Sequence, residues 1–257
     1  MKGVLRSIAL SSLALWGGAA QAGWSLSADL EQFRWKESGS PSVTERGPRL
    51  GFGWNYVAER PAGWQFAYRG QFRYGTVDYN GSFLFTGEAA TARTRYSGLL
   101  NEGQAIYRLP QHPLGLEFVS GLGWDYWERK ILPDQREDYG VGFLRLGANL
   151  DPRAPRGWFG GGGLKLPFYI SENAHLDQLG FDQNPRLEPK SELSLYAQAG
   201  YRFTSRWSLT GYYDGYRFGE SKPVRATSAS FPGTTFVIFQ PASRVDSFGL
   251  RLQYSFQ

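Results

Sequence analysis

The chain has 257 residues, of which 41% are hydrophobic and 20% are charged, and its formal net charge is +5. Its mean hydropathy is −0.42, and beyond the first two dozen residues no stretch approaches the roughly 20 apolar residues that a membrane-spanning helix needs. Basic and acidic residues are interspersed, which argues against a nucleic-acid-binding protein, and the absence of cysteine excludes disulfides and thiolate metal sites.

The first residues have the pattern of a secretory signal peptide. Lys2 and Arg6 form a basic start, residues 8–16 are a short apolar run, and Ala20 and Ala22 define a small-residue cleavage site. We expect cleavage after Ala22, so that residues 1–22 are the signal peptide and residues 23–257 form one mature domain. The mature chain would then pass through the periplasm.

Ten segments of the mature chain alternate between apolar and polar residues, which is the period of a β-strand with two different faces. They are residues 24–36, 49–57, 64–76, 93–109, 114–127, 139–150, 158–169, 192–203, 206–218 and 246–257. In the third segment, for example, Trp64 and Phe66 fall on the face opposite Gln65. The fourth changes phase at Leu99 and Leu100, which predicts a β-bulge there.

The connections between these segments alternate between long and short. The short ones are residues 58–63, 110–113, 151–157 and 204–205, and the long ones are 36–45, 78–91, 129–138, 171–190 and 219–242. Membrane barrels have tight periplasmic turns and larger external loops. We therefore predict an all-β fold, a transmembrane antiparallel up-and-down barrel of about ten strands. Its external loops would carry any binding, and residues 235–239 predict a hairpin above the membrane.

The last segment carries five apolar residues on one face, namely Phe248, Leu250, Leu252, Tyr254 and Phe256. It resembles the closing strand of bacterial outer-membrane β-barrels, whose terminal aromatic residue is the usual assembly signal, although Gln257 follows Phe256 here. The resemblance implies a place in a Gram-negative outer membrane, contact with its lipid and lipopolysaccharide, and assembly by periplasmic chaperones and the barrel-assembly machinery. Aromatic girdles are expected at both interfaces, with Tyr126, Tyr213 and Tyr216 at the external one.

Charged residues occupy many of the predicted inward positions. They are Asp29, Glu31, Arg49, Arg69, Arg73, Glu117, Asp125, Arg145, Lys165, Arg202, Asp214 and Arg251. Unpaired charges are costly in a narrow lumen, so this mixture of signs predicts an ion-paired plug. A narrow charged pore is the alternative, and the excess of basic residues would give it a weak preference for anions.

Acidic residues also occur at the external strand ends, where carboxylates could activate a water molecule. Asp125 and Asp214, together with His175, are the candidates for such catalysis. Ten strands and an acidic rim resemble the omptin surface proteases, which are thought to use an Asp pair and an Asp–His pair. The rim here has no Asp-x-Asp pair, and Asp177 follows His175 in the reverse order.

We therefore expect a non-enzymatic outer-membrane barrel that is either a small pore or a surface-exposed barrel with a binding or structural role. An omptin-like or other rim-located hydrolase is the alternative. No cofactor, metal or nucleic-acid partner is expected. The four glycines at residues 160–163 lack the Lys-Ser/Thr of a phosphate-binding loop and continue a strand instead.

Overall fold

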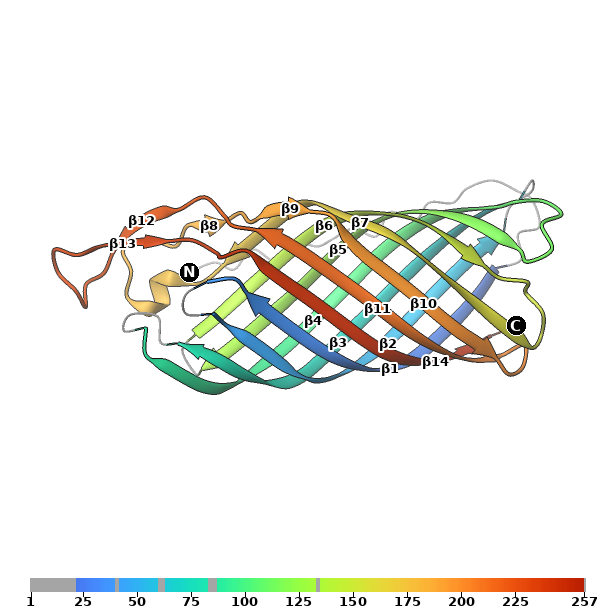
Figure 1. Cartoon of the computed structure of the whole chain (residues 1–257), viewed down its shortest axis with the longest axis horizontal. Coiled ribbons are helices and arrows are strands. Elements are labelled where there is room, and N and C mark those ends of the chain that lie inside the picture. Colours follow the sequence, from blue (N-terminus) through green and yellow to red (C-terminus); the bar gives the residue numbers. More distant parts are fainter. Residues whose placement is uncertain (1–21, 40–41, 60–62, 83–86, 133–134, 257) are drawn as a thin grey trace, which may run out of the picture.

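The computed structural model describes residues 22–39, 42–59, 63–82, 87–132 and 135–256 (Figure 1). The predicted signal peptide lies almost entirely outside this part, so its cleavage after Ala22 stays a prediction. Among the described residues, none forms a helix long and apolar enough to cross a membrane.

Ten long strands make up the barrel. They are β1 (Ala22–Glu37), β2 (Thr44–Glu59), β3 (Trp64–Ser82), β4 (Ala89–Arg108), β5 (Leu116–Leu132), β6 (Gln135–Leu150), β7 (Gly157–Asn173), β10 (Ser194–Arg202), β11 (Trp207–Gly219) and β14 (Ser243–Ser255). The short elements η2 (Leu176–Leu179), β8 (Arg186–Leu187), β9 (Lys190–Glu192), β12 (Val224–Thr227) and β13 (Thr235–Ile238) lie in the last two external connections.

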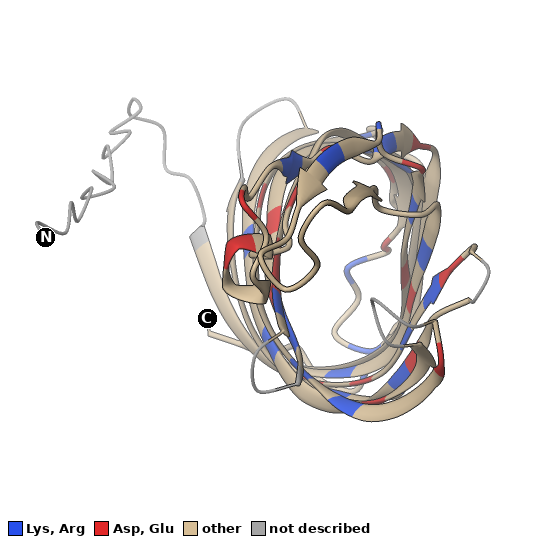
Figure 2. Ribbon diagram, turned by 90° about the vertical axis from the view of Figure 1, so that its left-hand side faces the viewer, with Lys and Arg blue, Asp and Glu red and all other residues tan. Residues whose placement is uncertain are grey.

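Antiparallel pairing closes the sheet on itself. β14 pairs with β1 from Ser25↔Ser255 to Glu37↔Ser243, and β7 pairs with β10, so that no long strand is left at an edge. Closing the sheet gives the backbone N–H and C=O groups of the edge strands hydrogen-bond partners, which water cannot supply inside a bilayer. The predicted antiparallel barrel of ten strands is confirmed (Figure 2), and so is the external hairpin, formed by β12 and β13.

The alternation places a band of apolar side chains on the outer wall. Among the large apolar residues that face outward and are exposed are Leu30, Leu50, Phe52, Phe72, Phe118, Leu122, Leu146, Leu164, Leu195, Leu209, Phe248 and Leu250. A water-soluble protein would bury most of this surface, whereas a barrel in a membrane covers it with lipid. On β1 the band ends above Leu30, where the outward positions become Gln32, Arg34 and Lys36.

The predicted bulge in the fourth strand is wrong. β4 pairs in an unbroken register with β3 and with β5, and its inward and outward positions alternate throughout. Leu99 faces lipid and is 38% exposed, whereas Leu100 faces the lumen and is 3% exposed, because both sides of the wall are apolar at this level. Two irregularities in register occur elsewhere: one between β5 and β6, between Lys130 and Leu132, and one between β6 and β7, where Phe168 and Tyr169 both face outward.

The external half of the lumen contains a hydrophobic core, which we call the aromatic cluster. It comprises Phe33, Trp35, Val77, Tyr96, Leu100, Trp127, Tyr139, Val141, Phe143, Ile170, Tyr216, Phe218 and Val245. Trp127 and Tyr139 stack with ring centroids 5.1 Å apart and an interplanar angle of 9°. Tyr216 therefore belongs to the lumen and not to the external aromatic girdle, which corrects the prediction made for it.

Replacing Phe143 with Ala should lower the free energy of unfolding by about 3–5 kcal/mol, because it leaves a cavity in the aromatic cluster. Urea-induced unfolding of the refolded barrel in lipid vesicles measures this difference. Leu146→Ala is the matched control, since Leu146 lies three residues below Phe143 on the same strand and faces lipid. Equal losses in the two variants would show that the cluster is not a packed core.

Candidate functional site

The inward side chains form layers along the barrel axis, and β1 shows their order. From its periplasmic end, the successive inward residues are serines, then Asp29 and Glu31, then Phe33 and Trp35, and finally Glu37. On β5, the inward residues Asp125, Trp127 and Arg129 follow one another toward the external end. The lumen therefore holds a polar mouth, an ion-pair layer, the aromatic cluster and a cluster of carboxylates near the external end.

In the ion-pair layer, charged groups from distant strands meet in direct contacts. Arg251 donates from Nε to Asp29 at 2.6 Å, and Gln71 also donates to Asp29 at 2.9 Å. Arg49 donates from Nε to Glu31 at 2.7 Å. Both carboxylates are buried, and each has a guanidinium partner as well as a neutral donor.

The opposite side of the layer is organised around Asp214. This carboxylate accepts from Arg145 at 3.0 Å and is ion-paired with Lys165. Arg145 also pairs with Glu102, with 3.0 Å between its Nε and the carboxylate. Two cations and two carboxylates thus neutralise one another across β4, β6, β7 and β11.

Asp125 lies deep in the same layer. It is ion-paired with Arg73 and accepts a hydrogen bond from the hydroxyl of Tyr216 at 3.0 Å. Tyr216 belongs to the aromatic cluster, so this contact joins the two layers. A cavity of about 20 Å³ between them has room for about one water molecule.

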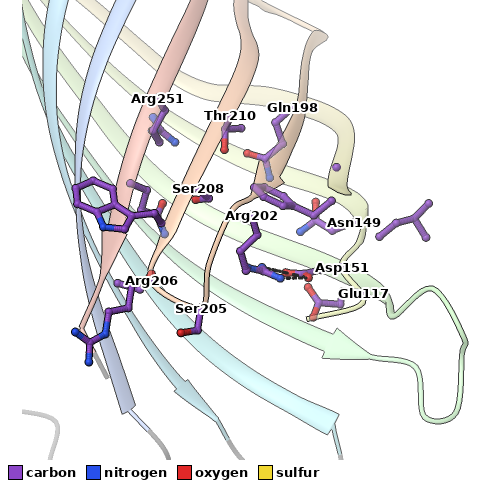
Figure 3. A pocket seen from close by; sticks show the side chains of 16 residues that line it. Glu117, Asn149, Asp151, Gln198, Arg202, Ser205, Arg206, Ser208, Thr210 and Arg251 are labelled. Atoms are coloured by element: carbon purple, nitrogen blue, oxygen red, sulfur yellow. Dashed lines mark hydrogen bonds and ion pairs between the residues drawn. The ribbon is translucent and has the colours of Figure 1, made fainter. Parts of the chain in front are cut away.

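The periplasmic mouth contains a cavity of about 220 Å³ (Figure 3). Arg202 forms a bidentate contact with Asp151, with a shortest distance of 2.9 Å. Glu117 accepts from Arg108 and Arg153, each at 3.2 Å. Most side chains that line this cavity are polar, as expected for a mouth that opens to water. Its acidic residues Asp151 and Glu117 both have arginine partners.

Above the ion pairs, the aromatic cluster occludes the lumen. Trp35, Tyr139 and Phe143 face the barrel axis, yet each has 0% of its surface exposed. In an open pore, side chains at such positions would line the water-filled channel and would be exposed to it. The rings from β1, β5, β6 and β11 instead pack on one another, and Trp127 and Tyr216 are also buried.

Glutamate side chains gather around one cation beyond the apolar band. We call them the carboxylate cluster, and they are Glu37, Glu45, Glu137 and Glu172. Arg129 pairs with Glu45 at 3.2 Å, with Glu37 at 3.4 Å and with Glu137. Burial raises the pKa of Glu172, and the nearby Glu137 and Glu37 carboxylates raise it further. Burial also raises the pKa of Glu37, in spite of Arg129.

The catalytic candidates are not brought together. Asp125 and Asp214 lie in the ion-pair layer beneath the aromatic cluster, where each is paired with a cation. His175 lies on the other side of the wall, with its Nε2 2.8 Å from Asp138 of β6, an outward-facing residue. A water molecule held by His175 and Asp138 would therefore be separated from both lumen carboxylates by the barrel wall.

All twelve charged residues predicted for the lumen face inward in the structure. Arg69 differs from the others, because it donates to the neutral Gln71 at 3.2 Å. Sequence reasoning missed Glu102, which follows the supposed bulge and would have been found by continuing the alternation of β4 unbroken. It also missed the carboxylate cluster and Arg129, because the predicted strands ended too early and assigned these residues to loops.

The last two external connections pack on each other and form an ordered platform outside the membrane. Leu176 and Phe181, from the connection after β7, are buried against Ala226 of β12 and pack with Phe236 of β13. Asp182 accepts hydrogen bonds from the backbone and side chain of Thr227 at 2.9 and 2.8 Å. These segments lie at the end of the barrel opposite the C-terminus (Figure 1).

Within the described part of the chain, no group of three or more His, Cys, Asp or Glu side chains is arranged to hold a metal ion. The carboxylate cluster does not make such a site, because Arg129 occupies its centre.

Comparison with solved structures finds barrels of the bacterial outer membrane. The protease OmpT of Escherichia coli has a TM-score of 0.53 and 10% identity, over 93% of this chain and 99% of that one. The transport unit of the E. coli autotransporter AIDA-I has a TM-score of 0.42 and 12% identity, over 95% and 94%. The Pseudomonas putida toluene transporter TodX has a TM-score of 0.41 and 10% identity, over 93% and 90%.

No protein-family model matches the sequence, and no curated protein matches it significantly. The likeness to OmpT shows a shared fold, and the apolar outer band agrees with it. The chain has the fold of a ten-stranded transmembrane β-barrel, like the outer-membrane proteins that it resembles in structure, and its lumen contains ion pairs and packed aromatic side chains.

Replacing Glu172 with Gln should stabilise the barrel at pH 8 by roughly 1 kcal/mol or more. The raised pKa of Glu172 means that the folded state holds this proton more tightly than the unfolded state. The stability that it contributes is present at low pH and is lost as the pH rises above the unfolded pKa. Unfolding by urea at pH 4 and pH 8 measures the gain, which should shrink at pH 4.

Glu188→Gln is the control for this experiment, since Glu188 is exposed on the platform. It should leave the pH dependence of stability unchanged. A Glu172→Gln variant that is equally destabilised at both pH values would contradict a buried, proton-binding carboxylate.

Proposed function

We propose that this protein is a non-conducting, non-enzymatic barrel of the outer membrane that acts through its external platform. The observation that carries the proposal is the complete burial of Trp35, Tyr139 and Phe143, which face the axis of the lumen. A solute that entered from the periplasmic mouth would meet the ion-pair layer and then the aromatic cluster. The cavity between these two layers has room for about one water molecule.

The pairing of the lumen charges supports the same conclusion. A selective pore needs charged groups that are free to contact the permeating ion. Here Asp29, Glu31, Asp125 and Asp214 each have a basic partner within the wall. The predicted ion-paired plug is thus the alternative that we favour over the narrow pore.

The platform offers the contact surface that such a role requires. The packed connections hold β12 and β13 in a fixed orientation, and their hairpin exposes Phe231, Val237 and Phe239 together with Arg225. Ordered, exposed apolar residues at the tip of a structured loop are typical of protein interaction sites. We infer that an extracellular partner binds to this hairpin.

Catalysis at the rim receives no support from the placement of the candidates. His175 and Asp138 lie on the outer wall, whereas Asp125 and Asp214 are buried in ion pairs.

We extend the proposal to the assembly of the barrel in the membrane. Strand β14, which closes the barrel against β1, is the segment that periplasmic chaperones and the assembly machinery would engage.

Refolded protein in a planar bilayer should give no steady conductance, although a heat-dependent shift in gel mobility should show that the barrel is folded. Ohmic steps would overturn the proposal, and a change of their ion selectivity in Arg69→Glu or Arg73→Glu would establish a pore through the lumen. The substitutions His175→Ala and Asp125→Ala address catalysis. Loss of a surface hydrolytic activity in both, with folding intact, would establish the hydrolase instead.

A further inference from the structure

The hairpin of β12 and β13 lies at the end of the barrel opposite the C-terminus (Figure 1). Its two strands pair with each other from Val224↔Ile238 to Thr227↔Thr235 and form a sheet separate from the barrel wall. A two-stranded sheet has two outer edges, and each presents backbone N–H and C=O groups that point away from the hairpin. The two edges of this hairpin differ in whether the rest of the chain covers them.

The outer edge of β12 is covered by the connection that follows β7. The backbone N–H of Asp182 donates to the carbonyl oxygen of Thr227 at 2.9 Å, and the Asp182 carboxylate accepts from the N–H of Thr227 at 2.9 Å. The side chain of Gln183 donates to the carbonyl oxygen of Arg225. The outward backbone groups of β12 therefore have partners within the platform.

The outer edge of β13 has no such cover. In an antiparallel pair, successive residues direct their backbone groups alternately toward the partner strand and away from it. Thr227 and Arg225 direct groups away from β13, as their contacts with Asp182 and Gln183 show. The residues opposite them are Thr235 and Val237, whose N–H and C=O groups therefore point away from β12.

These outward groups of β13 are available to a partner. Thr235 and Val237 are both exposed, and within the described ranges no hydrogen bond reaches their backbone N–H or C=O groups. We propose, building on the function proposed for the platform, that this free edge binds an extended segment of an extracellular protein, which adds to the hairpin as a further β-strand. Another extended backbone presents N–H and C=O groups at the same alternate spacing, so it fits this edge.

The composition of the edge supports this use. Residues 234–239 are threonine, phenylalanine, valine and isoleucine, with no charged residue, proline or glycine among them. Natural proteins protect exposed edges with charged residues, with proline or with a covering segment. The chain covers β12 in this way and leaves β13 without any of these protections.

The packing of the hairpin holds the edge ready for a partner. Phe236 and Ile238 pack against the buried cluster of the platform, whereas Val237 and Phe239 are 59% and 41% exposed. A strand that is already ordered loses little conformational freedom on binding. The exposed pair favours a partner segment with apolar residues at alternate positions.

A synthetic peptide of about seven residues, in which threonine and valine alternate, is the probe, because it forms an extended strand and carries no side-chain charge. Fluorescence anisotropy of the labelled peptide measures its binding to the mature chain, refolded in zwitterionic micelles. The peptide should bind saturably. The same peptide with a methyl group on every backbone nitrogen keeps its side chains and loses its donors, so it should bind at least about tenfold more weakly.

A matched pair of variants tests the edge itself. Val237→Pro removes an N–H that points outward and breaks no hydrogen bond of the hairpin, and it should weaken binding of the peptide at least about tenfold. Val237→Thr keeps the N–H and the β-branched shape, so its binding should stay within about threefold of the unmodified chain. Protection of the β12 amides from hydrogen exchange checks that the hairpin persists in both variants.

Four results would overturn the proposal. They are absence of peptide binding to the unmodified chain, equal binding of the methylated peptide, equal binding to Val237→Pro, and disulfide-linked dimers of Val237→Cys. Such dimers would show that a second copy occupies the edge, since the natural chain has no cysteine. The conductance measurement tests the proposed function separately, because a silent barrel without peptide binding would lose only this mode of recognition.

Discussion

The closure of ten alternating strands into a narrow barrel is the constraint on which the rest of this structure depends. It sends every second side chain into a lumen that excludes most water, where each charge needs a partner of the opposite sign. The chain supplies those partners itself, as Arg251 does for Asp29 and Arg49 does for Glu31. The same closure places the remaining side chains on the outer wall, where contact with lipid favours apolar residues.

The aromatic cluster changes what the barrel can do. Ion pairs alone would leave a polar lumen that water and small ions could enter, but Phe143 and Tyr216 pack above them and exclude solvent. The contact between Tyr216 and Asp125 fixes the two layers to each other. In the closed barrel that we propose, the ordered external platform is the surface available for function.

The sequence was sufficient to predict the fold, because the strands of a barrel wall have a period of two. It could not predict which charges would meet, since contacts such as Arg73 with Asp125 cross the lumen between strands far apart in the chain. The predicted β-bulge at Leu100 was wrong because two successive apolar residues look like a shift in the alternation of the strand. Leu100 in fact faces inward and packs in the aromatic cluster. Sequence reasoning missed Arg129 because the strands continue beyond the apolar band, where alternation no longer separates lipid from lumen.

The inner and outer faces of the barrel wall differ in how closely their charged side chains are paired. Inside, Lys165 and Arg145 share Asp214, as expected where no external ion can compensate them. Outside, Arg34 lies opposite Asp246 and Arg46 lies opposite Asp78 in the strand register, and neither cation forms a direct ion pair among the described residues. Water and salt screen exposed charges of this kind, so the outer wall does not need the close pairing that the lumen requires.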